Sequence, residues 1–197
     1  PIVEIKHFGT GPCRLFVKLE SQNPGGSIKD RMALAMIEAA EKDGRLKPGG
    51  TIVEATAGNT GLGLALIAAL KGYKIILVLP DKMSREKVLH CKALGADVRI
   101  ARSDVMKGHP EYYQDVANPS NVLAHEASTA PEIWAQMKHN VDAIVMGVGS
   151  GGTLTGIGNY FKKVSPQTEI ILADPAGSIL EPLVNRNEKV KPGSWVV

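Results

Sequence analysis

The stretch DAIVMGVGSGGT, residues 142–153, decides the fold, because an apolar strand-like run ends in a glycine-rich turn that opens a helical pattern. In both directions from it, similar apolar runs alternate with helical patterns. Near-continuous apolar runs are typical of strands covered on both faces, and their alternation with helices predicts an α/β fold with a parallel sheet. The expected strands are 2–5, 15–19, 51–53, 75–79, 98–101, 143–146 and 170–173, and the expected helices are 28–42, 60–70, 85–94, 131–138 and 153–164.

The alternation fails at one place, after the strand expected at 98–101. There the helical stretch HPEYYQDVA, which ends at Ala117, is followed by a turn at NPSN, Asn118–Asn121, and by another helix near Pro131. A doubly wound sheet needs a strand between two such helices. We therefore expect either an irregular topology here or a segment missing between Ala117 and Asn118.

Composition and charge narrow the classes of function. The 197 residues allow one domain or two small ones. A net charge of +3, with 5% aromatic residues and no basic cluster, argues against nucleic-acid binding. The apolar stretch 61–80 contains Lys71 and Lys74, so it predicts a buried helix and strand rather than a membrane span. Cys13 and Cys91 have no C-x-x-C spacing, which speaks against a metal site or redox pair and favours the reducing cytoplasm.

The first loop that could carry chemistry is NPGGSIKDR, residues 23–31. Ser27 can cap the helix that follows, and Lys29 then lies in the first turn of that helix. The positive end of the helix dipole disfavours a cation there, whereas an amine held neutral is what Schiff-base chemistry needs. The alternative is an ordinary surface lysine near a helix cap.

The second loop is TAGNTG, residues 56–61, directly after an expected strand. In open parallel sheets, ligands bind beyond the carboxyl ends of the strands. Thr56, Asn59 and Thr60 offer short donors suited to a carboxylate, and the backbone N–H groups of the following helix point the same way. An ordinary strand-to-helix turn capped by Thr60 is an equal alternative.

The third loop is GVGSGGT, residues 147–153, with four glycines and two hydroxyl groups at a helix N-terminus. This composition favours an anion cradle, most simply for phosphate. Gly147, Gly149 and Gly152 also match G-x-G-x-x-G, and Asp174 follows about 20 residues on, as in dinucleotide-binding folds. A nicotinamide-dependent oxidoreductase is therefore a second interpretation, although it leaves the first two loops without a role.

Taken together, the three loops resemble the fold type II pyridoxal-phosphate enzymes, and within them the cysteine synthase and cystathionine β-synthase branch. The resemblance runs through nearly the whole chain in order. It implies a fold like the β subunit of tryptophan synthase, with two open, twisted, mostly parallel sheets, helices on both faces, and pyridoxal 5′-phosphate between two lobes.

The resemblance also implies a role for each motif residue. Lys29 would bind the cofactor as a Schiff base and later move the α-proton. Asn59 would hydrogen-bond the 3′-oxygen of the cofactor ring. Lys82 would help to handle a second substrate, with a solvated lysine as the alternative. The phosphate would be held by Gly149, Ser150, Gly151, Gly152 and Thr153, and the substrate carboxylate by Thr56, Ala57, Gly58 and Thr60.

Two residues depart from the family pattern, and two histidines need an interpretation. Ala57 stands where family members often have Ser, which leaves only its backbone N–H for the carboxylate. Ser150 replaces a common Thr and keeps the hydroxyl group. His109 and His125 are interpreted as structural, because each is isolated in the sequence.

The segments 80–87, 108–113 and 174–178 look more like bacterial cystathionine β-synthases than cysteine synthases. The resemblance thus implies condensation of L-serine with L-homocysteine to cystathionine through an aminoacrylate, with Lys29 as general base. A cysteine synthase that uses O-acetylserine or O-phosphoserine with sulfide is the nearest alternative. A catalytically inactive scaffold member is a further one.

The resemblance implies a homodimer whose protomers have two lobes each. The smaller, mobile lobe would span 23–117 and carry the carboxylate loop, and the larger would combine 1–22 with 118–197 and carry the phosphate loop. Two family elements are not found: a Gln-aromatic strand end, expected between Ala117 and Asn118, and a Ser or Thr facing the pyridine nitrogen, expected beyond Val197. We therefore expect a missing internal segment and a missing C-terminal part.

Overall fold

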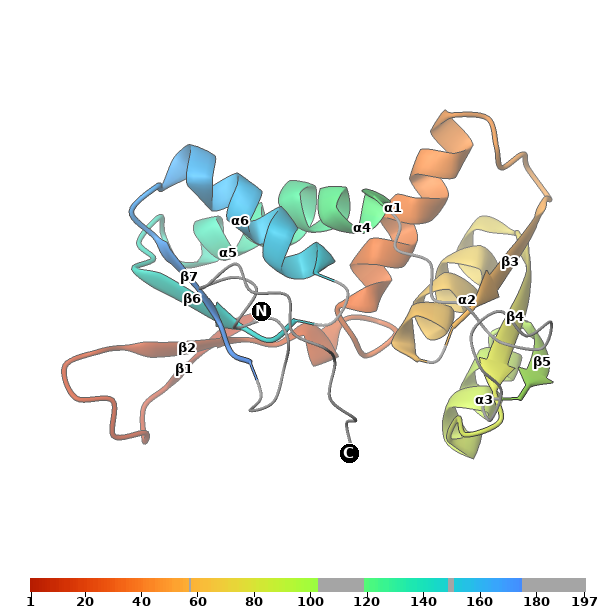
Figure 1. Ribbon diagram of the computed structural model, residues 1–197, viewed down its shortest axis with the longest axis horizontal. Coiled ribbons are helices and arrows are strands. Elements are labelled where there is room, and N and C mark those ends of the chain that lie inside the picture. The colour runs from red at the N-terminus through yellow and green to blue at the C-terminus, as the bar shows by residue number, and fades with distance from the viewer. Residues whose placement is uncertain (57, 103–118, 149–150, 175–197) are drawn as a thin grey trace, which may run out of the picture.

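The computed structural model describes residues 1–56, 58–102, 119–148 and 151–174, which alternate strands and helices as the hydrophobic pattern predicts (Figure 1). The expected strands and helices form with bounds that shift by one or two residues. The strands are β1 (Ile2–Ile5), β2 (Leu15–Lys18), β3 (Thr51–Ala55), β4 (Lys74–Pro80), β5 (Asp97–Ala101), β6 (Ala143–Met146) and β7 (Glu169–Leu172). The helices are η1 (Glu20–Gln22), α1 (Lys29–Lys42), α2 (Asn59–Lys71), α3 (Arg85–Ala93), α4 (Pro119–Ala124), η2 (His125–Thr129), α5 (Ala130–Gln136) and α6 (Gly152–Val164).

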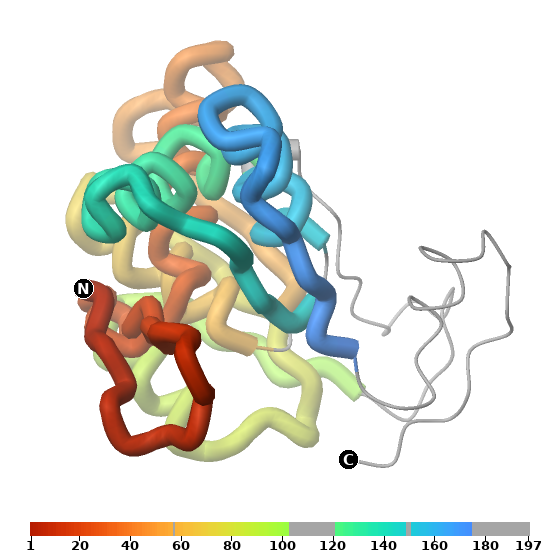
Figure 2. Tube along the Cα trace, turned by 90° about the vertical axis from the view of Figure 1, so that its left-hand side faces the viewer, coloured from red at the N-terminus to blue at the C-terminus, as the bar shows by residue number. Residues whose placement is uncertain are grey.

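The strands of the described residues form three sheets. The largest is parallel, in the order β3-β4-β5, and a second parallel pair joins β6 to β7, which run side by side in Figure 2. In contrast, β1 and β2 pair antiparallel. The connection at 6–14 is too short for the crossover that parallel strands need, so these two apolar runs fold back as a hairpin.

Two apolar clusters hold the elements together. One lies between the β3-β4-β5 sheet and helices α1, α2 and α3, and the other between α5, α6 and the β6–β7 pair. The first contains Ala33, Ile37, Leu62, Leu64, Ala65, Ile67, Ala68, Ile75, Leu77, Leu79, Cys91 and Ala96. The second contains Ala130, Ile133, Ile157 and Phe161. Burial of these side chains, at about 25 cal/mol per Å² of apolar surface, fixes which face each helix presents.

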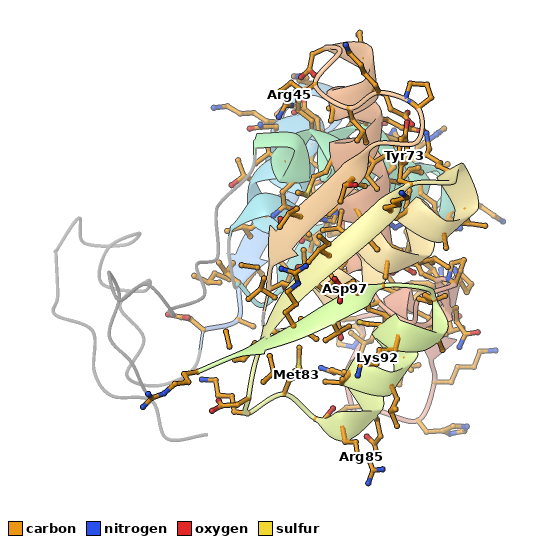
Figure 3. All side chains as sticks on the ribbon, turned by 90° about the vertical axis from the view of Figure 1, so that its right-hand side faces the viewer. Arg45, Tyr73, Met83, Arg85, Lys92 and Asp97 are labelled. Atoms are coloured by element: carbon orange, nitrogen blue, oxygen red, sulfur yellow. The ribbon has the colours of Figure 1, made fainter. Side chains whose placement is uncertain are left out.

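Different residues lie at the two ends of the β3-β4-β5 sheet. Figure 3 shows Arg45 and Tyr73 near the amino end of β4, and Met83 and Arg85 beyond its carboxyl end. At the amino end, the Tyr73 hydroxyl donates to Glu41 over 2.8 Å and ties the start of β4 to α1. The carboxyl end of β3 leads into the loop that opens α2, which is where a parallel sheet places its ligands.

Helix α1 lies between the two clusters and contacts both α2 and α4 (Figure 1). Its close approach to α2 depends on Gly63. A Cβ atom at Gly63 would lie 3.0 Å from the Lys29 carbonyl oxygen and 3.2 Å from the Cβ of Ala33. The missing side chain therefore lets α2 pack directly against the first turns of α1.

The turn expected at Asn118–Asn121 is wrong for the residues that the structure describes. Helix α4 begins at Pro119 and continues through the π-helical segment η2 into α5. Proline fits the first position of a helix, and Asn121 is buried in the packing between α4 and α6. Tertiary packing therefore overrides the turn propensity of this Asn-Pro-Ser-Asn stretch.

Several expectations lie outside the described residues: the helical stretch that ends at Ala117, the junction between Ala117 and Asn118, and the C-terminal part. None of the described helices is long and apolar enough to cross a membrane.

Candidate functional site

Lys29 is the first residue of α1, at the end of a loop held by its own backbone and side chains. The Ser27 hydroxyl accepts the Lys29 N–H over 3.2 Å, and the buried Asp30 carboxylate accepts the Gly25 N–H over 2.6 Å. Burial raises the pKa of Asp30, and the Gly25 hydrogen bond opposes part of that rise. A side chain at Gly25 would collide with this carboxylate, so the loop closes tightly around the start of the helix.

An ionic cluster fixes α1 two residues beyond Lys29. Arg31 bonds Glu20 at 2.7 and 2.9 Å and bonds Glu132 of α5 at 2.7 Å. Lys18 donates to the same Glu132 over 2.6 Å. Partial burial would raise the pKa of Glu132, but the hydrogen bonds from Lys18 and Arg31 outweigh it and lower that pKa to about 2. The cluster thus ties α1 to β2, η1 and α5.

The loop after β3 packs against the start of α2. Thr56 is buried, its N–H donates to the Val78 carbonyl over 3.0 Å, and its hydroxyl accepts the Gly58 N–H over 3.4 Å. A Cβ atom at Gly61 would lie 2.6 Å from the Thr56 Cγ2 atom, so this glycine lets the loop fold onto the helix. Asn59 is exposed and Thr60 half-buried at the first two positions of α2. Ala57 lies outside the described residues.

The loop after β6 opens α6 through a left-handed residue. Gly151 has φ +85°, which favours glycine, and α6 begins at Gly152 with neither a side-chain cap nor an acidic residue in its first turn. A helix N-terminus of this kind offers backbone N–H donors to an anion, and the half-buried Thr153 adds a hydroxyl group there. Gly149 and Ser150 lie outside the described residues. The β6-α6-β7 arrangement is the strand-helix-strand unit that both phosphate-binding interpretations require.

His125 connects the third loop to the first. Its Nε2 lies 3.2 Å from the Thr153 Oγ1 and its Nδ1 lies 2.8 Å from the Thr129 Oγ1. Burial, followed by the positive charge of Lys29, lowers the pKa of His125 to about 4. Helix α1, which begins at Lys29, contacts η2, which carries His125, and η2 in turn packs against α6, which carries Thr153. The first turns of α1, α2 and α6 face the same central region in Figure 1.

Sequence reasoning missed the position of His125 in this cluster. Its only local signal is the spacing of four residues to Thr129, and the contact to Thr153 is 28 residues distant in the sequence. Lys82 is exposed in the turn between β4 and α3, and no described contact links it to Lys29. His109 lies outside the described residues.

The donor set fits a ligand that carries both a phosphate and a carbonyl group. The N–H groups of the α6 first turn and the Thr153 hydroxyl suit the phosphate. A half-buried lysine amine at the start of α1 suits the carbonyl carbon. The first turn of α2 is also free of acidic residues, so its N–H groups can receive a carboxylate.

Comparisons with known proteins agree with this donor set. The family model described as "Pyridoxal-phosphate dependent enzyme" matches residues 1–192. The chain is 45% identical to a cystathionine beta-synthase of Apis mellifera, over 90% of this chain and 39% of that protein. It is 44% identical to a cysteine synthase of Staphylococcus aureus (strain Mu50), over 90% of this chain and 62% of that protein.

Solved structures give the same answer for the fold. A crystal structure of O-ureido-L-serine synthase has a TM-score of 0.84 at 32% identity and covers 98% of this chain and 65% of its own. A hydrogen sulfide-producing enzyme from Fusobacterium nucleatum has a TM-score of 0.83 at 36% identity and covers 97% of this chain and 66% of its own. The chain thus spans between 39% and 66% of the length of these relatives. It has the fold type II architecture and belongs to the family of pyridoxal-phosphate dependent enzymes.

Proposed function

We propose that this chain forms the cofactor site of an enzyme that condenses L-serine with L-homocysteine to cystathionine, a β-replacement that depends on pyridoxal phosphate. The observation that carries the proposal is the packing of α1, which begins at Lys29, against α2 and η2, with η2 in turn packed against α6. Gly63 of α2 lies against the Lys29 backbone, and His125 of η2 contacts the Thr153 hydroxyl of α6. An amine, a carboxylate-binding turn and a phosphate-binding turn then surround one substrate.

In this proposal, Lys29 attaches the cofactor through Nζ and afterwards holds the proton taken from the substrate α-carbon. The phosphate lies against the N–H groups of the α6 first turn and the hydroxyl of Thr153, together with Gly149 and Ser150. The bound cofactor supplies an electron sink for the carbanion chemistry. Asn59 hydrogen-bonds the ring oxygen of the cofactor, from the first position of α2.

The substrate carboxylate binds the loop that follows β3. Thr56 and Thr60 offer hydroxyl groups there, and Ala57 and Gly58 offer backbone N–H groups. We propose that residues 23–117 form the smaller lobe, which closes this loop over the substrate and excludes water. Lys82, exposed on the same lobe, would meet the second substrate.

The experiment that tests the attachment compares Lys29→Ala with Lys42→Ala, an exposed lysine at the other end of the same helix. The unaltered protein and Lys42→Ala should bind the cofactor covalently and keep it after borohydride reduction. Lys29→Ala should lose both the covalent bond and cystathionine formation. Peptide mapping that finds the reduced cofactor on any other lysine would overturn the proposal.

Cysteine synthase activity is a second candidate, because the cysteine synthase of S. aureus is about as similar to this chain as the cystathionine beta-synthase. The two activities differ in the nucleophile. Rates should be measured with serine or O-acetylserine as first substrate, and with homocysteine or sulfide as acceptor. A preference for sulfide with an activated serine would replace the first candidate by the second.

A further inference from the structure

His125 is the fully buried polar side chain that joins two elements of the site. It is 0% exposed and lies in η2, between α4 and α5. Its Nδ1 is 2.8 Å from the hydroxyl of Thr129, which is 1% exposed, and its Nε2 is 3.2 Å from the hydroxyl of Thr153. Both ring nitrogens therefore have a hydroxyl partner, and one partner is in the phosphate-binding turn.

The ring is also held firmly in place. A Cβ atom at Gly156 of α6 would lie 2.8 Å from the Cβ of His125 and 2.9 Å from the backbone nitrogen of Glu126. The glycine lets α6 lie directly on η2 at the Cβ of His125, and the whole residue is enclosed, with 0% exposed. A side chain fixed in this way can orient the groups it touches.

The imidazole is neutral at physiological pH, because burial and the charge of Lys29 lower its pKa to about 4. The charge of Glu20 acts in the opposite direction and that of Arg31 in the same direction as Lys29, and both are smaller effects. A neutral imidazole carries one N–H, so one ring nitrogen donates and the other accepts. The hydrogen bonds that link Thr129, His125 and Thr153 can therefore run in either of two directions.

The two directions differ in what they leave for an anion at α6. If Nδ1 carries the proton, Thr153 must donate to Nε2, and only its oxygen lone pairs face the anion. If Nε2 carries the proton, it donates to Thr153, and the Thr153 hydroxyl is free to donate to the anion. The hydroxyl of Thr129 then donates to Nδ1. An anion at the α6 N-terminus favours the second arrangement, because lone pairs that face it would repel it.

We propose that Thr129, His125 and Thr153 form a directed hydrogen-bond relay, in which His125 carries its proton on Nε2 and aims the Thr153 hydroxyl at the cofactor phosphate. The inference rests on the proposed function, since it takes the anion to be that phosphate. His125 is here a positioning residue, which acts on the cofactor through Thr153.

The direct test is the tautomer of His125 in the cofactor-loaded protein, read from the ¹⁵N chemical shifts of its ring. His125→Asn assigns the signal by its loss, and His90→Asn, at an exposed histidine of α3, is the matched control. A protonated Nε2 with an accepting Nδ1 supports the relay. A protonated Nδ1, or an imidazolium, overturns it.

The second test measures cofactor affinity. Thr129→Val removes the donor to Nδ1 with little change of shape, and Thr129→Ser keeps it. Because a hydrogen bond to a charged group contributes substantially to binding, Thr129→Val should raise the Kd for the cofactor on the order of tenfold. The Kd of Thr129→Ser should stay within about twofold of that of the unaltered protein. Equal affinities of the two variants would contradict the relay. Thr155→Val, at an exposed threonine of α6, controls for the substitution itself.

Two further arms separate this inference from the proposed function. In a Lys29→Ala background the Thr129→Val effect should persist, because the relay acts on the phosphate and not on the covalent bond. If the unaltered protein binds no cofactor, the proposed function fails. The tautomer measured with inorganic phosphate at the α6 N-terminus then decides the relay independently, with the same two outcomes.

Discussion

Replacing Gly156 by Ala adds one methyl group where α6 lies on η2. The new Cβ atom would collide with the carbonyl oxygen of Val122, and it would lie 2.8 Å from the His125 Cβ and 2.9 Å from the Glu126 nitrogen. Two of these three atoms are backbone, so no flexible side chain can yield. Helix α6 must therefore move away from η2, and Thr153 must move away from His125.

The size of the effect follows from two opposed terms. Overpacking costs about 1–3 kcal/mol, and contact with two backbone atoms places this site near the upper end of that range. Alanine gains about 1 kcal/mol over glycine in helix propensity. The net loss is about 2 kcal/mol, which lowers Tm by roughly 4–8 °C for a chain of this length.

The matched control is Gly158→Ala, two residues further along the same helix, where an added Cβ meets nothing within 4 Å. It should stabilise the protein by about 0.5–1 kcal/mol, because only the propensity gain remains. Urea unfolding followed by circular dichroism measures both variants. Gly156→Ala as stable as Gly158→Ala would refute the close packing of α6 on η2.

Three further predictions concern the ionic cluster, the buried His125 and the two cysteine thiols. Glu132→Gln weakens the bond to Arg31 and should lower the free energy of unfolding by about 1–2 kcal/mol at low salt. The loss should be smaller at high salt, because salt screens the ion pair. An unchanged urea midpoint would argue against the ionic cluster. His125 has a pKa lowered to about 4 in the folded protein from 6.5, so its contribution to stability is complete above pH 6.5 and is lost as the pH falls through 4, by at most roughly 3 kcal/mol. His125→Asn should flatten the stability profile over that interval, and an identical slope in both proteins would count against the burial of a neutral imidazole. Cys13 is exposed, whereas Cys91 is buried with its pKa raised by burial, so a thiol reagent should modify one thiol quickly and the second only on unfolding.

Local patterns were sufficient for the order and type of most elements. Near-continuous apolar runs such as 75–79 became buried strands, and the glycine-rich loops before Asn59 and Gly152 became the openings of helices. These outcomes depend on hydrophobic burial and on glycine conformations, both of which act over a few residues. The same locality explains the error at Asn118–Asn121, where the turn propensity is local but the packing of Asn121 is not.

The sequence by itself determined the family of this chain and the residue types of its site, because the lysine and the glycine-rich turns stand in contiguous motifs. Only the tertiary structure decided how those motifs are held together. The ionic cluster around Arg31 joins residues more than 100 positions apart, and the contact of His125 with Thr153 spans 28. Such contacts arise when helices pack, and their geometry depends on where glycines such as Gly63 and Gly156 permit a close approach. The spacing of residues along the sequence does not give the distance between packed helices, so the position of His125 beside the first turn of α6 appears only in the folded chain.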